Sequence, residues 1–237
     1  MLRIDVITPF PEMLRGFFEH SMVKRAQDKG LADIRFCDLR LFATDKHKTV
    51  DDYPYGGGAG MILKPAPIFR AVESCLKSNP EGMARIIYPS PQGSQFNQQK
   101  AEELSQAGHV IFICGHYRGV DERVIEDLVT EEISIGDFVL SGGELASAVI
   151  IDAAVRLIPG VLGDMDSADG DSFSGNRLDH PHYTRPRRYR GIQVPEVLLS
   201  GHHDRIDIWR ERESISRTIK KRPDLMIGKK SKKNKGE

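Results

Sequence analysis

Two periods of apolar and polar positions alternate along the first 135 residues, and they predict strands and helices in turn. Short apolar runs predict strands over residues 2–7, 31–39, 84–88, 110–114 and 133–135. Helical spacing separates these runs over residues 12–20, 22–28, 67–77, 122–129 and, after a capping Asn97, up to residue 106. Short strands alternating with helices are typical of a parallel sheet covered on both faces. The pattern therefore predicts an α/β fold.

The longest apolar stretch predicts a helix over residues 144–158, which a Pro-Gly pair ends. Its charged side chains, Glu144, Asp152 and Arg156, fall within about a third of the helix circumference. We therefore expect this helix to be buried on nearly every side. The polar stripe has two interpretations: an i,i+4 ion pair between Asp152 and Arg156, or side chains with a functional role.

Three loops that follow predicted strands carry glycine, namely residues 88–93, 114–121 and 135–143. Ligands of open parallel sheets bind at the carboxyl ends of the strands, where backbone can approach them closely. We therefore expect the three loops to converge on one pocket.

A polar loop over residues 44–60 ends in a run of glycines. The run matches neither G-x-G-x-x-G nor a P-loop, because no Lys-Ser/Thr follows it and no clear strand precedes it. Two interpretations remain open: a flexible linker, or an RNA-binding loop in which Tyr53 and Tyr55 stack on bases.

The amino-acid composition of the chain changes after residue 160. Residues 161–180 are small, acidic and glycine-containing, which is typical of an interdomain linker. A short apolar element at 197–199 and a helix over about 206–220 follow. We expect a sheet domain over 1–160, the linker, a small and mainly α-helical domain over 181–226, and a disordered basic tail over 227–237.

Charge separates the two ends of the chain, although the net charge is zero. Residues 185–237 contain 16 Lys and Arg against 7 Asp and Glu, a net charge of +9, whereas residues 1–184 contain 18 against 27, or −9. A basic C-terminal part predicts a polyanionic partner such as a nucleic acid.

Composition excludes several classes of protein. The chain is 39% hydrophobic and 29% charged, as in ordinary globular proteins, and no apolar run has membrane-spanning length. It opens directly into a predicted strand, so we expect no signal peptide. Three scattered cysteines without C-x-x-C argue against a disulfide framework or a zinc site, and for a reducing cytoplasm.

Motifs from residue 1 to about 226 together resemble the bacterial tRNA (guanine-N(1))-methyltransferases, knotted enzymes of the SPOUT class. Those in the N-terminal part are Thr8-Pro9-Phe10-Pro11-Glu12-Met13, Gly56-Gly57-Gly58-Ala59-Gly60-Met61, Tyr88-Pro89-Ser90-Pro91-Gln92-Gly93, Cys114-Gly115-His116-Tyr117, Gly119-Val120-Asp121-Glu122-Arg123, Gly136-Asp137-Phe138-Val139-Leu140-Ser141-Gly142-Gly143-Glu144-Leu145 and Arg156-Leu157-Ile158-Pro159-Gly160-Val161-Leu162-Gly163. Those in the C-terminal part include Asp171-Ser172-Phe173, Leu178-Asp179, Pro181-His182-Tyr183-Thr184-Arg185-Pro186 and Val197-Leu198-Leu199-Ser200-Gly201-His202.

The resemblance implies a deep trefoil knot on the C-terminal side of the sheet domain, near residues 88–143. It also implies that S-adenosylmethionine, the methyl donor, binds bent within that knot. The cofactor-binding residues that it implies are Tyr88, Pro91, Gly115, Ile135, Gly136, Asp137, Phe138, Val139, Leu140, Gly142 and Gly143.

The substrate implied by the resemblance is the guanine at position 37 of tRNA, beside the anticodon, where methylation helps maintain the reading frame. Asp171 matches the family's general base, and Arg156 matches the residue that stabilises charge on the guanine O(6). The family works as a homodimer with each active site between two subunits, and it needs Mg²⁺, for which we assign no ligands. The substrate-binding residues that it implies are Tyr117, Asp179, His182, Tyr183 and Arg185.

The chain departs from the family's pattern at two places. Arg118 stands where the family usually has an acidic residue, and Asn176-Arg177 replaces a usual Gly-Leu. The contact made at position 118 therefore cannot be transferred from the family. Two alternative functions remain open: a non-catalytic RNA-binding protein, and a related knotted methyltransferase with another RNA target.

Overall fold

The computed structural model describes residues 1–80, 83–162 and 170–226. The chain divides into two compact units, Met1–Gly163 and Asp164–Glu237, and each is described by itself. Most of the acidic part of the predicted linker (163–169) and the predicted tail (227–237) lie outside the described residues. Among the described helices, none has both the length and the apolar character needed to cross a membrane.

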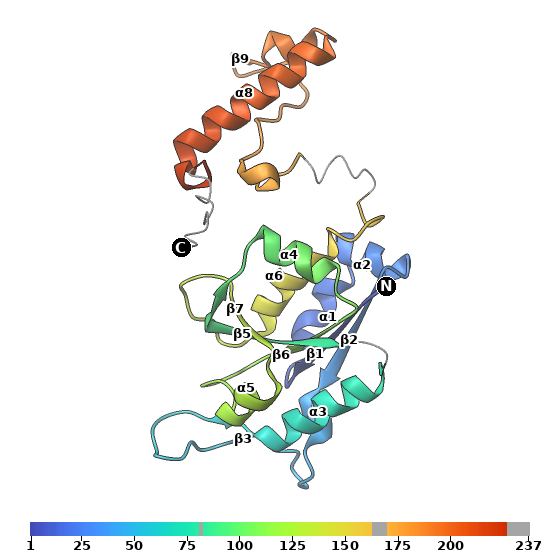
Figure 1. Cartoon of the computed structure of the whole chain (residues 1–237), viewed down its shortest axis with the longest axis vertical. Helices are drawn as coiled ribbons and strands as arrows, with labels where there is room; N and C mark the ends of the chain where they lie inside the picture. Colours follow the sequence, from blue (N-terminus) through green and yellow to red (C-terminus); the bar gives the residue numbers. More distant parts are fainter. Residues whose placement is uncertain (81–82, 163–169, 227–237) are drawn as a thin grey trace, which may run out of the picture. The chain divides into compact units, whose positions relative to one another are not determined.

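The first unit is built on one five-stranded sheet (Figure 1). In the order β2-β1-β6-β5-β7, every neighbouring pair is parallel. The strands are β1 (Leu2–Thr8), β2 (Ala32–Asp38), β5 (Ala84–Gln95), β6 (His109–Ile113) and β7 (Glu131–Ser134). The predicted α/β class with a parallel sheet is confirmed.

Helices cover both faces of this sheet (Figure 1). One face packs against α1 (Glu12–Phe18), α2 (Ser21–Asp28), α4 (Gln98–Ser105) and α6 (Glu144–Val155), and the other against α3 (Pro65–Lys77) and α5 (Glu122–Leu128).

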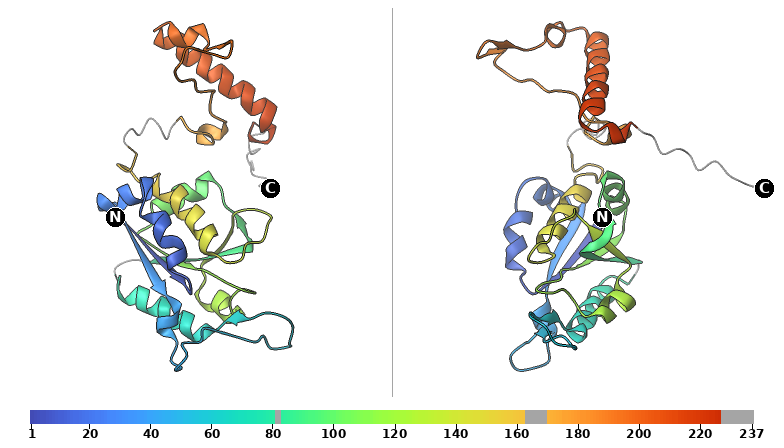
Figure 2. Two further views of the ribbon diagram at one scale, coloured as in Figure 1. Left: turned by 180° about the vertical axis from the view of Figure 1, so that it is seen from behind. Right: turned by 90° about the vertical axis from the view of Figure 1, so that its left-hand side faces the viewer.

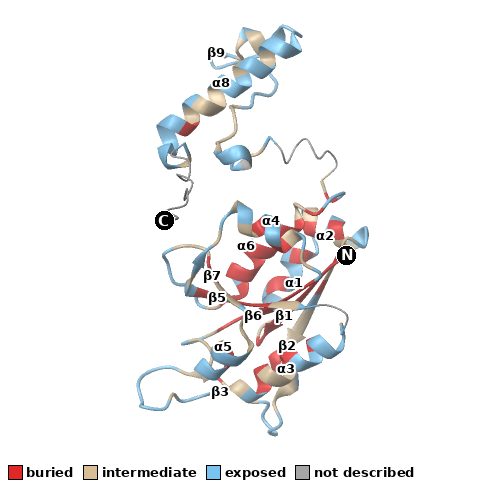
Figure 3. Cartoon of the chain, in the orientation of Figure 1, coloured by how far each residue is buried: buried red, intermediate tan, exposed pale blue. Residues whose placement is uncertain are grey.

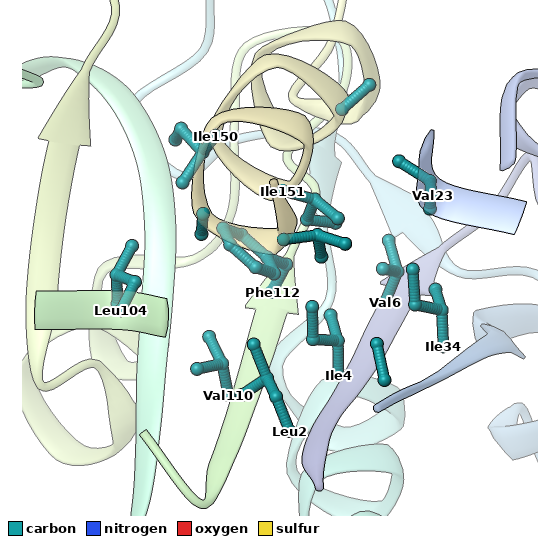
Figure 4. Packing of buried hydrophobic residues seen from close by; sticks show 14 of the residues in the cluster. Leu2, Ile4, Val6, Val23, Ile34, Leu104, Val110, Phe112, Ile150 and Ile151 are labelled. Atoms are coloured by element: carbon teal, nitrogen blue, oxygen red, sulfur yellow. The ribbon is translucent and has the colours of Figure 1, made fainter. Parts of the chain in front are cut away.

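Successive residues of a strand belong to different hydrophobic cores. Ile4 of β1 and Phe112 of β6 pack with Ile151 of α6 in the first core, as Figure 4 shows, whereas Ile7 and Ile111 belong to the second. Because successive side chains of a strand point to opposite faces, one apolar strand supplies both cores.

The sheet differs from the prediction at β5 and β7. β5 runs on to Gln95, and its pairing with β7 shifts register between Pro89 and Ser94, so the predicted loop 88–93 is a bulge within a strand. β7 starts at Glu131, earlier than its apolar residues indicate. The charged side chain of Glu131 is accommodated because β7 lies at the edge of the sheet. The Glu131 carboxylate pairs there with the Lys100 ammonium group at 2.7 Å.

The polar loop over residues 44–60 is anchored at its base, which the sequence pattern did not predict. β3 (Asp51–Asp52) and β4 (Ile62–Leu63) form a short antiparallel ladder, and the intervening loop stands out from the unit (Figures 1 and 2). Lys64 N–H donates to the carbonyl of Val50, a buried residue, at 2.7 Å. The interpretation as a simple flexible linker is therefore wrong at Asp51–Asp52, which belong to the ladder. Before it, a 3₁₀ turn spans Leu39–Phe42.

The burial predicted for α6 is wrong on one side. Leu145 and Val149 are 54% and 49% exposed and lie four residues apart, on one face of the helix. By contrast, Glu144 is only 1% exposed. The apolar pattern alone cannot separate a helix enclosed by its own chain from one with an uncovered apolar face.

The second unit is organised along α8 (His203–Lys221), which starts three residues earlier than predicted (Figure 2). Most of α8 is exposed or half-buried, as Figure 3 shows. Thr218 is the single buried residue described in this helix, and its hydroxyl accepts a hydrogen bond from Leu178 N–H at 2.9 Å. The remaining elements are 3₁₀ turns at Ser174–Asn176, Glu196–Leu199 and Pro223–Leu225, and a hairpin of β8 (Arg188–Tyr189) and β9 (Ile192–Gln193). The hairpin was not predicted.

Candidate functional site

A pocket of about 410 Å³ lies at the carboxyl ends of β5, β6 and β7, three neighbouring strands. The three glycine-containing segments predicted to converge all line it, together with parts of α5 and α6. Its size falls within the range of small-molecule sites. The convergence predicted from the order of strands and loops is therefore observed.

Most residues expected to bind the cofactor line this pocket. They are Tyr88, Pro91, Gly115, Ile135, Gly136, Phe138, Val139, Leu140, Gly142 and Gly143. Asp137 does not line it and is exposed. Tyr117, expected to bind substrate, and Arg118 lie on the same wall.

Two glycines are required by close packing around the pocket. A Cβ atom on Gly115 would lie 2.7 Å from the Tyr88 hydroxyl, and one on Gly143 would lie 3.0 Å from the Cα of Cys114. Both distances are shorter than a normal contact. The loops thus present backbone to the pocket at points where a side chain would fill the space.

Backbone hydrogen bonds join the loops to each other. Gly143 N–H donates to the carbonyl of Gly115 at 2.7 Å, and His116 forms an antiparallel bridge with Gly142. The loop after β6 is also tied to the glycine-rich segment, because the Arg118 guanidinium donates to the carbonyl of Ala59 at 2.9 Å. Arg118, the departure noted in the sequence, therefore links the pocket wall to the polar loop.

A buried carboxylate, Glu144, lies next to His116 of the pocket lining. Glu144 accepts a hydrogen bond from the Thr8 hydroxyl at 2.7 Å, and its other oxygen lies 3.7 Å from Nδ1 of His116. Burial raises the pKa of the neighbouring Cys114 thiol, and the charge of Glu144 raises it further. Sequence reasoning missed this arrangement, since Thr8 and Glu144 are 136 residues apart and no spacing pattern relates them.

The Tyr88 phenol remains protonated at neutral pH. Burial of its side chain, with the nearby charge of Glu132, raises the pKa of Tyr88 above its ordinary value. The side chain therefore offers a neutral hydrogen-bonding group on the pocket wall.

The two residues expected to take part in catalysis belong to different units. Arg156 caps the carboxyl end of α6, is partly buried and is not among the residues lining the large pocket. Asp171 belongs to the second unit, where it lines a smaller pocket of about 200 Å³.

The second unit brings Asp179 and His182 together, both expected to contact substrate. Oδ2 of Asp179 lies 2.6 Å from Nε2 of His182, and Asp179 N–H donates to the hydroxyl of Ser172 at 3.1 Å. Burial opposes ionisation of Asp179, but hydrogen bonds from His182 and from the His180 amide outweigh it, so the pKa of Asp179 lies below its ordinary value. The carboxyl group is therefore an anion at neutral pH.

The other expected substrate contacts are accessible. Tyr183 is 48% exposed, with its ring 6.4 Å from that of Trp209, and Arg185 is exposed. Trp209 is half-buried on α8 and lies at the same distance from the ring of His180.

One group of potential metal ligands occurs among the described residues, and it consists of Asp179, His180 and His182. Magnesium prefers oxygen ligands, whereas this group offers two imidazoles and one carboxylate. The group does not fit Mg²⁺. We therefore assign no Mg²⁺ site among the described residues.

Comparisons with known proteins identify the family of this chain. Residues 2–228 match the family described as tRNA (Guanine-1)-methyltransferase TrmD. The chain is 56% identical over 225 residues to a "tRNA (guanine-N(1)-)-methyltransferase" of Anoxybacillus flavithermus, which covers 95% of this chain and 91% of that protein. The same identity extends over 226 residues of a relative with the same name from Dictyoglomus turgidum, 95% of this chain and 90% of that protein.

These matches span both units, and their extent leaves no substantial part of the described chain unaccounted for. The chain belongs to the tRNA (guanine-1)-methyltransferase TrmD family.

Proposed function

We propose that this protein transfers a methyl group from S-adenosylmethionine to N(1) of the guanine at position 37 of tRNA. The family, and the names of its close relatives, identify a tRNA (guanine-N(1))-methyltransferase. The observation that supports this reaction best is the glycine-walled pocket at the ends of β5, β6 and β7.

The pocket fits the proposed cofactor. Its backbone-lined wall around Gly115 and Gly143 suits close hydrogen bonding to an adenine edge, and Tyr88 and Leu140 supply apolar surface. S-adenosylmethionine, when bound, supplies a methyl group on a positively charged sulfur. The trefoil knot around this region remains part of the proposal.

The guanine must lose a proton to react, because N(1) of neutral guanine bears one and is a poor nucleophile. We assign the removal of that proton to the Asp171 carboxylate. The negative charge then moves onto O(6), and we assign its stabilisation to the Arg156 guanidinium.

A homodimer is consistent with the uncovered face of α6. Leu145 and Val149 are exposed, and Arg156 follows on the same side of the helix at i+11 from Leu145. An apolar face of this kind suits a second copy of the chain, which would bring Arg156 close to the contact between subunits. Each active site would then combine residues of two subunits.

The second unit supplies the tRNA contacts in this proposal. Residues 185–226 contain 11 Lys and Arg against 6 Asp and Glu, and the arginines of the β8–β9 hairpin are exposed. Arginines on such a surface mostly contact phosphates. The cytoplasm remains the proposed compartment, consistent with the three free thiols of Cys37, Cys75 and Cys114.

The proposal is tested by replacing the base. Asp171→Asn keeps the size of the side chain but removes its capacity to accept the proton, so we expect a loss of methyl transfer of at least about 100-fold. The binding of S-adenosylmethionine, measured by calorimetry, should stay within about twofold. Nuclease digestion and mass spectrometry of the tRNA identify the methylated atom.

The matched control is Asp204→Asn, an exposed carboxylate in the first turn of α8. It should leave the rate nearly unchanged. An equal loss of cofactor binding and of rate in Asp171→Asn would contradict the base role, and wild-type protein that binds no cofactor would favour a non-catalytic RNA-binding protein.

A further inference from the structure

Asp179, His180 and His182 present three ligand atoms to one small volume. These atoms, one from each side chain, all lie within 4.8 Å of one another. Oδ1 of Asp179 lies 3.8 Å from Nε2 of His180, and Oδ2 lies 2.6 Å from Nε2 of His182. The two imidazole rings are 4.4 Å apart between centroids. A small movement of the side chains therefore places all three atoms around a single cation.

The ring orientation of His180 is the one seen in metal-binding histidines. Nδ1 of His180 lies 3.3 Å from the carbonyl of Pro181, which leaves Nε2 on the side of Asp179. Metal-ligating histidines commonly donate the second ring N–H to a backbone carbonyl or a carboxylate, and this bond fixes the tautomer. A proton on Nδ1 leaves the Nε2 lone pair available to a metal.

The backbone carrying the three side chains is held in place by α8. Leu178 N–H donates to the Thr218 hydroxyl at 2.9 Å, and the Ser214 hydroxyl donates to the Leu178 carbonyl at 2.6 Å. The Asp179 carboxylate is oriented further by the His180 amide at 2.6 Å. Hydrogen bonds within the chain thus supply much of the ordering that a metal site requires.

We propose that Asp179, His180 and His182 bind a divalent transition-metal ion of the zinc and cobalt class. Two neutral imidazoles and one carboxylate are ligands that such ions prefer, whereas Mg²⁺ and Ca²⁺ prefer oxygen. The three scattered cysteines argued against a zinc site in this sequence, but histidines can form one without them.

The ion in this site keeps open coordination positions. Three protein ligands occupy one side of it, and the His182 side chain is 69% exposed, so the remaining positions face solvent. An open site of this kind takes water or an exogenous oxygen ligand. Binding requires the Asp179–His182 hydrogen bond to open, because the two ligand atoms are 2.6 Å apart and a metal needs them farther apart.

Trp209 provides a direct probe of the site, since it is the only tryptophan of the chain and its ring lies 6.4 Å from that of His180. Titration of the full-length, metal-free protein with Co²⁺, a paramagnetic ion, should quench Trp209 fluorescence with saturation at one ion per chain. Zn²⁺ should displace the Co²⁺ and restore the emission. Mg²⁺ at the same concentration should not.

The variants His180→Asn and His182→Asn should each weaken Co²⁺ binding by more than about tenfold, because the loss even of outer-shell partners costs that much. The matched control is the double variant His202→Asn/His203→Asn, which removes two exposed imidazoles at the start of the same helix and should bind as wild type does. Far-UV circular dichroism verifies the fold of each protein.

Three results would overturn the proposal: quenching that does not saturate, equal affinity in the two single variants and the wild type, or displacement of Co²⁺ by Mg²⁺ at equal concentration. The first two would reduce the cluster to a hydrogen-bonded Asp–His pair. The measurement uses neither tRNA nor S-adenosylmethionine, so its outcome is independent of the proposed methyl transfer.

Discussion

At the scale of single residues, Gly93 marks the point where β5 bulges against β7. A Cβ atom there would overlap the backbone of Glu132 and Ile133, neither of which is the flexible end of a side chain. Gly93→Ala should therefore destabilise the protein by about 1–3 kcal/mol, the usual cost of overpacking. Denaturant unfolding followed by circular dichroism measures the change.

Gly108→Ala is the matched control for this prediction. A Cβ on Gly108 meets no atom within 4 Å, so the substitution should change the free energy of unfolding by less than about 0.5 kcal/mol. Similar unfolding midpoints for the two variants would show that the bulge adjusts to a side chain.

Most of the pocket lining could be named from the sequence, but the buried carboxylate next to it could not. Gly115 and Gly143 belong to motifs that the family resemblance identifies, and the structure places both on the pocket wall. Glu144 belongs to the same motif as Gly143, yet its contact is with Thr8 of β1. A contact between residues so far apart in the chain depends on the order of strands in the sheet, which periodicity does not encode.

At the scale of elements, the uncovered face of α6 carries the proposed dimer contact. Val149→Glu puts a charge at the centre of that face, and its desolvation opposes association, so we expect dimers to dissociate at micromolar concentration. Light scattering coupled to size-exclusion chromatography measures the mass. The rate of methyl transfer should fall as the dimers dissociate, because each proposed active site needs two subunits.

Met13→Glu is the control for the surface charge itself, since Met13 is 51% exposed on α1. This variant should keep the mass and activity of the wild type. An unchanged mass for Val149→Glu would place the subunit contact elsewhere.

At the scale of the whole molecule, the separation of charge predicts that the basic C-terminal part contacts tRNA. The double variant Arg187→Ala/Arg188→Ala removes two exposed cations beside the β8–β9 hairpin. We expect it to bind tRNA several-fold more weakly and to lower the slope of log affinity against log salt by about one per lost phosphate contact. Filter binding over a series of salt concentrations measures both quantities.

The control for this prediction is Arg35→Ala in the first unit, where the Arg35 guanidinium pairs with Asp33 at 2.7 Å. It removes one positive charge far in sequence from the basic segment and should leave the salt slope unchanged. Equal slopes for all three proteins would exclude the hairpin arginines as phosphate contacts.

The sequence by itself determined the α/β class, the approximate positions of the strands and the family. It did so because apolar periodicity follows directly from which side chains a strand or helix must bury, and because short motifs preserve the residues around a ligand. It also indicated that three glycine-containing segments follow strands and would meet, since parallel strands place their carboxyl ends on one edge of a sheet.

Only the tertiary structure decided the contacts between residues distant in the chain. It joined the Thr8 hydroxyl to Glu144, turned a predicted loop after Tyr88 into a bulge against β7, and left Leu145 and Val149 exposed. The physical reason is the same in each case: burial and proximity depend on which elements become neighbours. The free energy that favours one arrangement of elements over another comes from contacts throughout the core. A local sequence pattern carries information about one element only.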